Sequence, residues 1–278
     1  MHILGTSDRP DLPLSVVIGA GTMGMAVARR MAQRCRVLLA DLDGVKAEGR
    51  AAAMREEGCD ARGTACDVTD PAAVAALAGR VAELGGLGVL VHVAGLSPSL
   101  GDYTTIMRVN LMGVALVAEA LLPLARQSSA AILISSLAAH NFRPSDEAIA
   151  ILREPAAPDL AERLAAAIGP QAAIPPMAYV YAKWGILAYA RRNAAAWGAK
   201  GARIVSLSPG LIATTQGALE FEKSPGKKAM YEQTPLAREG TMLEIADAVE
   251  FLASERASFI SGTDLLVDGG LAGAMARD

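Results

Sequence analysis

Short apolar runs alternate with longer segments of helical periodicity along most of the chain. The runs have the length of buried strands and cover residues 14–18, 36–40, 88–93, 130–134, 203–207 and 265–267, with a weaker strand at 61–65. Segments such as 25–32, 45–57 and 103–126 lie between them and repeat apolar residues at helical spacing. Strands that are apolar throughout and alternate with helices predict an α/β fold in which helices cover both faces of a parallel sheet. We therefore expect a Rossmann-type, doubly wound sheet of about seven strands, in a single domain that spans residues 14–272.

Two segments depart from this alternation. Residues 141–176 hold six of the fourteen prolines and contain two helix-like pieces, 145–152 and 158–168, so we expect a helical insertion. A passive surface excursion is the alternative. Residues 214–235 form a long polar stretch, which in a compact domain is usually functional. We expect a substrate lid there, whose apolar residues Leu219, Phe221, Met230 and Tyr231 suggest an apolar substrate; the same residues could instead pack the lid down.

The charge balance gives no reason to expect a nucleic acid or an anionic membrane as a partner, because 26 Lys and Arg stand against 29 Asp and Glu. The composition, 52% hydrophobic and 20% charged, is that of a folded globular protein. No run of 18 apolar residues is present to span a membrane. The first residues include Asp8, Arg9 and Pro10, where a signal peptide would need an apolar stretch.

The cysteines and histidines do not suggest a metal site. The cysteines are an odd number without metal-ligand spacing, and the histidines are scattered: Cys35, Cys59, Cys66, His2, His92 and His140. This cysteine usage suits a reduced, cytoplasmic setting best.

A glycine loop follows the first apolar run directly and passes into a helical pattern. It reads Gly19-Ala20-Gly21-Thr22-Met23-Gly24. In a strand–loop–helix context, G-x-G-x-x-G lets the backbone approach a pyrophosphate, whose charge the helix N-terminus meets. The sequence therefore predicts a dinucleotide site formed by Gly19, Gly21, Thr22, Met23 and Gly24; a simple glycine turn is the alternative.

Asp41 ends the second apolar run, 22 positions after Gly19. A carboxylate at this spacing accepts hydrogen bonds from an adenosine ribose. It would repel a 2′-phosphate, and the next residue is Leu42 rather than Arg, so we expect NAD rather than NADP. Asp41 or Asp43 could instead cap the helix that begins near Gly44.

Polar residues and glycines follow several of the other strands. They are Asp67, Gly95, Ser136 and Pro209. Because ligands of such sheets bind beyond the carboxyl ends of the strands, we expect these residues to gather with Asp41 at one edge.

Tyr179 and Lys183 are four residues apart in an Ala-rich, helix-favouring run, so both side chains lie on one helix face. A cation beside a phenol favours the phenolate, and a Tyr tuned in this way acts as a general acid or base. Tyr181 has Gly185 four residues on and would point to another face. A surface or packing pair is the alternative for Tyr179 and Lys183.

Taken in order, these residues resemble the short-chain dehydrogenase/reductase family from Leu14 to Gly270. The resemblance rests on the glycine loop, Asp41, Asp67-Val68, Ala94-Gly95, Asn110, Ser136, Tyr179 with Lys183, Pro209-Gly210-Leu211-Ile212-Ala213-Thr214, and Val267-Asp268-Gly269-Gly270.

The resemblance implies four catalytic residues. Tyr179 would exchange a proton with the substrate oxygen, and Lys183 would lower the pKa of Tyr179 and bind the nicotinamide ribose. Ser136 would hydrogen-bond the reacting oxygen, and Asn110 would hold a water that relays protons from Lys183. The cofactor contacts that it implies are Asp67 and Val68 around the adenine, Ala94 and Gly95 along the cofactor, and Pro209, Gly210, Ile212 and Thr214 at the carboxamide.

Three features depart from the family pattern. The glycine loop is one residue shorter than usual, which changes the phosphate contacts. His92-Val93 stands where the family has Asn-Asn. Ser136 and Tyr179 are 43 positions apart, against about a dozen in the family. The 141–176 insertion that results is placed like that of the 3α-hydroxysteroid dehydrogenase/carbonyl reductases.

The resemblance therefore implies an NAD(H)-dependent oxidoreductase that interconverts a secondary alcohol and a ketone or aldehyde. Its partner would be a small-molecule substrate, and a homodimer or homotetramer is expected. A catalytically silent dinucleotide-binding regulator or scaffold is the alternative from a different class, and an enzyme that uses NADP is the third possibility.

Overall fold

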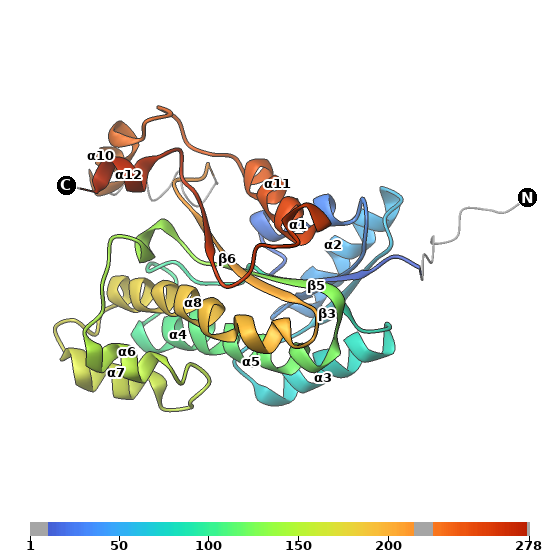
Figure 1. Ribbon diagram of the computed structural model, residues 1–278, viewed down its shortest axis with the longest axis horizontal. Coiled ribbons are helices and arrows are strands. Elements are labelled where there is room, and N and C mark those ends of the chain that lie inside the picture. The colour runs from blue at the N-terminus through green and yellow to red at the C-terminus, as the bar shows by residue number, and fades with distance from the viewer. Residues whose placement is uncertain (1–10, 214–224, 277–278) are drawn as a thin grey trace, which may run out of the picture.

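The computed structural model describes residues 11–213 and 225–276 and shows one seven-stranded sheet between two layers of helices (Figure 1). Every strand pair is parallel, in the order β3-β2-β1-β4-β5-β6-β7. The strands are β1 (Leu14–Ile18), β2 (Arg36–Asp41), β3 (Ala61–Ala65), β4 (Leu87–His92), β5 (Ala125–Ile134), β6 (Arg203–Pro209) and β7 (Asp264–Val267). The expected single-domain Rossmann-type fold is thereby confirmed.

Each face of the sheet carries its own apolar core. Val16, Leu38 and Leu90 contribute to one core, and their neighbours Val17, Leu39 and Val91 to the other. Because successive side chains of a strand alternate between faces, a strand that is apolar throughout can be buried on both. Burying each such side chain contributes about 1.5–3 kcal/mol, so the two-sided burial explains the continuous apolar runs.

The helices divide between these two faces (Figure 1). On one face lie α1 (Thr22–Met31), α2 (Gly44–Glu56) and α11 (Met242–Ala253). On the other lie α3 (Pro71–Glu83), α4 (Tyr103–Met107), α5 (Gly113–Leu121) and α8 (Pro175–Gly198).

Side-chain caps fix where several helices begin. Asp70 accepts from the Ala72 amide at 2.9 Å, with Pro71 at the first position of α3. Asp43 accepts from the Lys46 amide at 3.0 Å and is the N-cap of α2. Of the two acidic residues that could have capped this helix, Asp43 therefore does so, which leaves Asp41 with other contacts.

The helix predicted over 103–126 is wrong at its end and irregular in its middle. A π-turn, Arg108–Met112, separates α4 from α5, and a 3₁₀ turn, Leu122–Leu124, follows α5. Pro123 lacks an amide hydrogen and cannot continue an α-helix. The chain then becomes extended at Ala125, which pairs with Leu87, so β5 begins five residues before the apolar run.

Residues Tyr103–Leu124 are long and apolar enough to cross a membrane by length and composition alone. Their most apolar window is 61% buried inside the protein. Its side chains contribute to the core between the sheet and α8. The segment is therefore a core helix.

The two segments that break the alternation contain helices. Residues 141–176 include α6 (Asp146–Leu152) and α7 (Leu160–Ile168), whose apolar sides pack into the same core as α8. Within 214–235, the structure describes α10 (Pro225–Gln233), and Leu219, Phe221 and Thr214 lie outside the described residues.

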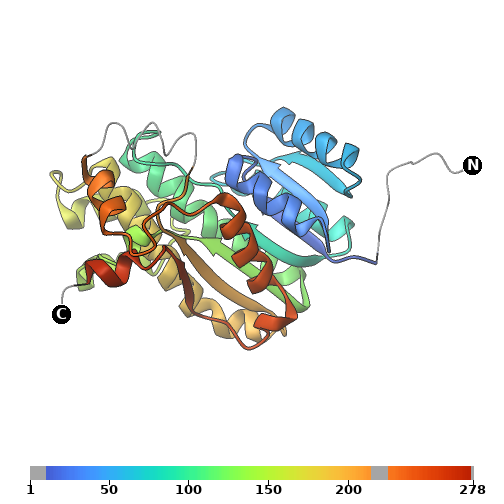
Figure 2. The same ribbon diagram turned by 90° about the horizontal axis from the view of Figure 1, so that it is seen from above.

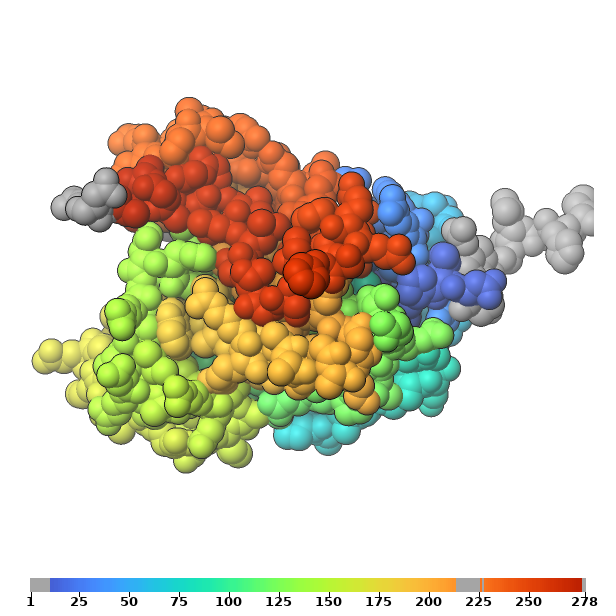
Figure 3. All heavy atoms as spheres, viewed as in Figure 1, coloured from blue at the N-terminus to red at the C-terminus, as the bar shows by residue number. Residues whose placement is uncertain are grey.

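The C-terminal helix α12 (Leu271–Met275) lies beside α10 at one end of the molecule (Figure 2). The C-terminal segment that contains β7 lies beside α8 on the face shown in Figure 3. A Cβ on Gly262, just before β7, would lie 2.8 Å from the Cβ of Ala194 in α8. The C-terminal part of the chain thus completes both the sheet and its functional end.

Candidate active site

A cavity of about 370 Å³ opens at the carboxyl ends of the strands. It contains twelve of the residues singled out from the sequence: Gly19, Gly21, Thr22, Met23, Gly24, Gly95, Ser136, Tyr179, Lys183, Pro209, Gly210 and Ile212. These residues come from segments up to about 190 positions apart (Gly19 to Ile212) and meet because parallel strands all end at the same edge.

The glycine loop is shaped by two close approaches. Gly19 has φ +105°, and a Cβ there would lie 2.9 Å from the Ala94 amide nitrogen. A Cβ on Gly24 would overlap the carbonyl oxygen of Gly19. Both positions therefore require glycine for packing reasons alone.

Gly21 differs, because a Cβ on it would point into open space. It is the N-cap of α1 and provides no side-chain cap. The first amides of a helix have no intrahelical partner, so an uncapped N-terminus on a cavity is a site for an anion such as a pyrophosphate.

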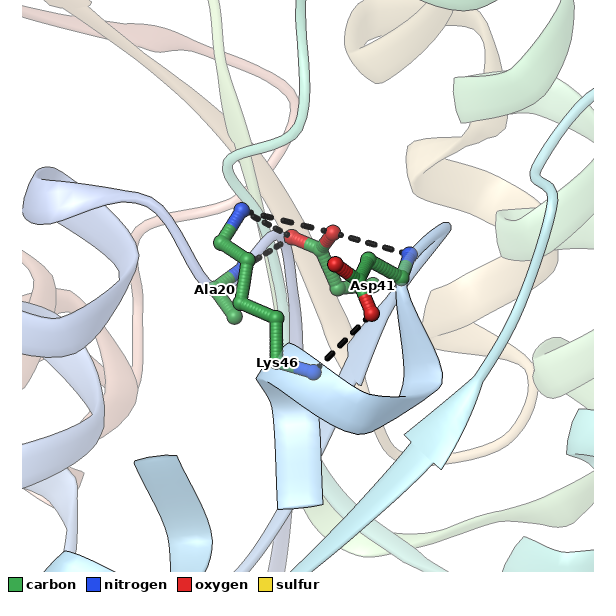
Figure 4. Close-up of polar contacts among 4 residues, drawn as sticks. Ala20, Asp41 and Lys46 are labelled. Carbon is green, nitrogen blue, oxygen red and sulfur yellow. Dashed lines mark hydrogen bonds and ion pairs between the residues drawn. The ribbon is translucent and has the colours of Figure 1, made fainter. Parts of the chain in front are cut away.

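Asp41 contacts both the glycine loop and α2 (Figure 4). Its Oδ2 accepts from the Ala20 amide at 2.6 Å and lies 3.2 Å from Lys46 Nζ. No sequence spacing points to Lys46, because its contact with Asp41 depends on the direction in which α2 leaves the strand. Leu42, the next residue, is 73% exposed at the outer rim.

The predicted adenine contacts Asp67 and Val68 lie in a turn after β3. Asp67 Oδ1 accepts from the amide and the hydroxyl of Thr69, each at 2.8 Å. The side chain of Val68 is buried against Gly113. Val68 therefore presents its backbone rather than its side chain to any ligand on this edge.

Asn110 lies in the π-turn behind the cavity wall and is fully buried. Its Oδ1 accepts from the Leu96 amide at 2.7 Å, and its Nδ2 donates to the Leu96 carbonyl at 2.8 Å. The side chain thus fixes the segment that follows Ala94 and Gly95. π-Turns of this kind are frequent at functional sites.

Tyr179 and Lys183 lie together on α8, as the i, i+4 spacing predicts. Lys183 Nζ is 5.6 Å from the centre of the Tyr179 ring and donates to the Ile134 carbonyl at 2.8 Å. Burial lowers the pKa of Lys183 to about 8. Tyr181 turns away from the cavity, and its ring packs edge-to-face on Phe142.

The two serines after β5 have different environments. Ser135 is buried and its hydroxyl donates to the Lys183 carbonyl at 2.8 Å, whereas Ser136 is half-buried and begins a 3₁₀ turn, Leu137–Ala139. Both line the cavity. The geometry favours Ser136, the residue expected from the sequence, as the one available to a substrate oxygen.

His92 stands behind this group, wholly buried at the end of β4. Neither ring nitrogen has a hydrogen-bond partner within the described part of the chain. Burial, and secondarily the charge of Lys183, lowers its pKa to about 3, so the imidazole is neutral.

Residues 209–212, which follow β6 in the chain, form a further wall of the cavity. The Gly210 amide donates to the Val267 carbonyl at 2.9 Å, and Ile212 forms an isolated bridge with Gly240. This contact brings a segment into the cavity wall that the sequence argument missed. Leu211, within the predicted 209–214 motif, also lines the cavity. The lining residues that were not predicted as site residues are Val93, Leu96, Ser97, Ile134, Ser135, Glu239 and Met242.

The cavity thus brings together the glycine loop and the Tyr–Lys–Ser group of the predicted site. The other predicted contacts described by the structure do not line it: Asp41, Leu42, Asp67, Val68, Ala94 and Asn110. The cavity has an uncapped helix N-terminus suited to phosphates and a Tyr–Lys–Ser group, and the Asp41 carboxylate at the end of β2 contacts the glycine loop from outside the lining. The Tyr–Lys–Ser group can exchange a proton with a bound oxygen next to the cofactor.

The chain is similar to several known proteins. The chain matches the family model described as Enoyl-(Acyl carrier protein) reductase over residues 19–173 and 164–272. It is 30% identical to D-threitol dehydrogenase from Mycolicibacterium smegmatis over 272 residues, covering 94% of each chain. The crystal structure of gox2181 covers 94% of this chain and 96% of its own, with a TM-score of 0.76 and 26% identity. The Pseudomonas aeruginosa RhlG/NADP active-site complex shares the fold, with a TM-score of 0.73 at 20% identity, over 94% of this chain and 96% of that one. The chain belongs to the short-chain dehydrogenase/reductase family of oxidoreductases.

Proposed function

We propose that this oxidoreductase uses NAD(H) to interconvert a secondary alcohol and a ketone, with Tyr179 as the general acid and base. The observation that carries the proposal is the buried ammonium of Lys183 beside the Tyr179 ring, on a cavity that Ser136 also lines. The bound nicotinamide supplies the hydride acceptor or donor, and the chain supplies orientation and a proton.

In the direction of oxidation, Tyr179 takes the proton from the alcohol, and in reduction it returns a proton to the carbonyl oxygen. Ser136 donates a hydrogen bond to the reacting oxygen. Lys183 stabilises the negative charge that Tyr179 carries in one half of the cycle, because a cation nearby favours the phenolate. Desolvation around Lys183 strengthens this electrostatic effect.

The proton relay implied for Asn110 takes a specific form in this chain. Both polar ends of the Asn110 side chain are occupied by Leu96. We therefore assign the water-holding role to the main-chain carbonyl of Asn110, within the π-turn, and give the side chain the role of fixing the wall beside Gly95.

Asp41 supports NAD as the cofactor, since its carboxylate would accept from a ribose hydroxyl and repel a 2′-phosphate. Lys46 weakens this argument by bringing a cation to the same carboxylate. The proposal is tested by the dissociation constants of NADH and NADPH, measured by fluorescence titration. Tighter binding of NADPH would refute the role of Asp41.

We expect the substrate to be an apolar or cyclic secondary alcohol, because Leu96, Leu211, Ile212 and Met242 give the cavity an apolar wall. The likeness to D-threitol dehydrogenase adds polyols to the candidates. A panel of hydroxysteroids, cyclic alcohols, polyols and hydroxyacyl compounds with NAD would identify the class. Assembly as a homodimer or homotetramer is part of the same proposal.

The decisive variant is Tyr179→Phe, with Tyr181→Phe as its matched control on the same helix. We expect Tyr179→Phe to bind NADH like the wild type and to lose at least about 100-fold in turnover of any accepted substrate. Tyr181→Phe should keep its turnover, because Tyr181 packs on Phe142 outside the cavity. Full activity of Tyr179→Phe would overturn the mechanism.

A further inference from the structure

A buried carboxylate joins three segments behind the cavity. Asp264, the first residue of β7, has a side chain that is only 4% exposed. Its Oδ1 accepts from the Ser208 hydroxyl at 3.0 Å, and its Oδ2 lies 2.9 Å from His140 Nε2. A carboxylate only accepts hydrogen bonds, so Nε2 carries the proton and donates.

His140 is connected to Ser136 through a short turn. Ser136 Oγ accepts from the Ala138 amide at 3.2 Å, and the Ala139 amide donates to the Ser136 carbonyl at 3.0 Å. The His140 amide then donates to the Leu137 carbonyl at 2.9 Å. The three residues of the 3₁₀ turn, Leu137–Ala139, therefore separate Ser136 from His140.

Ser208, the other partner of Asp264, is connected to the cavity wall that follows β6. Ser208 is fully buried and directly precedes Pro209 and Gly210, which line the cavity. One carboxylate thus ties the turn that carries Ser136 to the strand end that forms the opposite wall.

Ser136 is held from its other side as well, because the neighbouring Ser135 hydroxyl donates to the Lys183 carbonyl. This hydrogen bond from Ser135 fixes Ser136 relative to α8 and Tyr179. The Ser135 amide also donates to the Leu207 carbonyl on β6 at 2.8 Å, and the contact through Asp264 holds the other side of the serine to β6 and β7.

We propose that His140 and Asp264 are positioning residues, whose hydrogen bond holds Ser136 at the correct distance from the 209–212 wall for binding the reacting oxygen. The proposal rests on the function given above, in which Ser136 binds that oxygen. A misplacement of about 1 Å at such a group can cost 100-fold in rate, so loss of the tie would lower turnover without removing any group that touches the substrate.

The test is a double-mutant cycle of His140→Ala and Ser136→Ala, with His140→Gln as the conservative variant, because the amide nitrogen of Gln reaches the position of Nε2. Turnover is measured with the best alcohol of the panel and NAD. His140→Ala should lower kcat by about tenfold, with the dissociation constant of NADH unchanged, and His140→Gln should restore most of it. In the Ser136→Ala background the same change should cost less than about twofold, because the group being positioned is gone.

An equal loss in both backgrounds, or equal loss in His140→Ala and His140→Gln, would refute the positioning role. Amide hydrogen exchange tests the tie without any turnover. The amides of Ala139 and His140 should exchange faster in His140→Ala than in the wild type or His140→Gln, while amides within α8 should not change. Unchanged exchange refutes the tie. Full turnover by Ser136→Ala together with faster exchange would refute the proposed role of Ser136 and leave the tie standing.

Discussion

Lys183 donates to the main-chain carbonyl of Ile134 at 2.8 Å, so the lysine beside Tyr179 also binds the last residue of β5. The two residues that follow Ile134 are Ser135 and Ser136. One buried ammonium therefore fixes the end of the strand that carries the serine and provides the charge next to the phenol. Lys183 should therefore affect activity through Tyr179 and stability through its burial against β5, and the two effects can be measured separately.

Replacing Lys183 by Met should lower turnover at least about 100-fold, because Tyr179 loses the neighbouring cation. Lys200→Met is the matched control, since Lys200 is an exposed lysine just beyond the same helix. Steady-state kinetics with one alcohol of the panel compares the two. Similar turnover in both variants would contradict the electrostatic role of Lys183.

The pH dependence of stability should reveal the same lysine. Burial lowers the pKa of Lys183 from 10.5 to about 8, so between these values the unfolded chain binds the proton more strongly and the folded form is favoured as pH rises. The difference in unfolding free energy between the wild type and Lys183→Met should shift by about 2 kcal/mol toward the wild type from pH 8 to pH 10. Urea unfolding at both pH values measures it; a constant difference would show that the ammonium is well solvated.

Gly21 and Gly24 should respond to alanine in opposite ways. Gly24→Ala would place a methyl group on the Gly19 carbonyl and should destabilise the protein by more than about 2 kcal/mol. Gly21 has φ −73°, which alanine also adopts, and a Cβ there would lie in open space. The unfolding free energy of Gly21→Ala should therefore stay within about 0.5 kcal/mol of the wild type. NADH binding should nevertheless weaken about tenfold or more in Gly21→Ala, because the methyl group occupies the approach of the pyrophosphate. If folded Gly21→Ala bound NADH with wild-type affinity, the phosphates of the cofactor would not bind at Gly21.

His92 should make the protein sensitive to acid. Its pKa is about 3 in the fold against 6.5 for an ordinary histidine, so the unfolded chain binds the proton first as pH falls. From pH 7 to pH 5 this group should cost the wild type about 2 kcal/mol of unfolding free energy. His92→Asn, which does not titrate, should lose correspondingly less over the same range. Parallel pH profiles in chemical denaturation would mean that the imidazole protonates within the folded protein.

Arg203 should matter for stability alone. Its guanidinium is buried and donates to the carbonyls of Leu252, Ser254 and Ile260 at 2.8 to 3.2 Å, which closes the C-terminal end of α11. Arg203→Met would leave these carbonyls without a donor and should cost about 2–4 kcal/mol. Arg203→Lys should recover part of the loss. NADH affinity should be unchanged in both variants, because Arg203 lies at the start of β6, away from the cavity; a weakened NADH affinity would contradict this separation.

The order and type of nearly all strands followed from the sequence because their apolar runs are continuous and their ends carry glycine or polar residues. The misplaced start of β5 shows the limit of this reasoning. Residues 125–129 read Ala-Arg-Gln-Ser-Ser and have no apolar run. They join β5 because Ala125 pairs with Leu87 on the neighbouring strand, and a register shift with a left-handed Ser128 (φ +67°) separates this pair from the apolar run. Such pairing is a tertiary effect that local pattern does not encode.

The candidate site was predictable where a residue type has a defined place in a motif, as with Gly19, Ser136 and Tyr179. It was not predictable where the contact crosses the fold. Lys46 reaches Asp41 through the direction of α2, and His140 meets Asp264 across 124 positions. Neither pair has a sequence spacing that points to the other residue.

The two hydrogen bonds between Asn110 and Leu96 mark a boundary in the cavity wall. The wall up to Leu96 is held by the helix, and the turn that begins at Ser97 is not held by this contact. Residues up to Leu96 are fastened to the helix core, whereas the turn after it closes on itself through Ser97 Oγ and Ser99 Oγ at 2.9 Å and through the Leu100 amide and the Ser97 carbonyl at 3.0 Å. Asp102 then starts α4 afresh as its N-cap. Ser97 lines the cavity just beyond the Asn110–Leu96 contact, so substitutions at this residue offer a way to change substrate range while that contact stays intact.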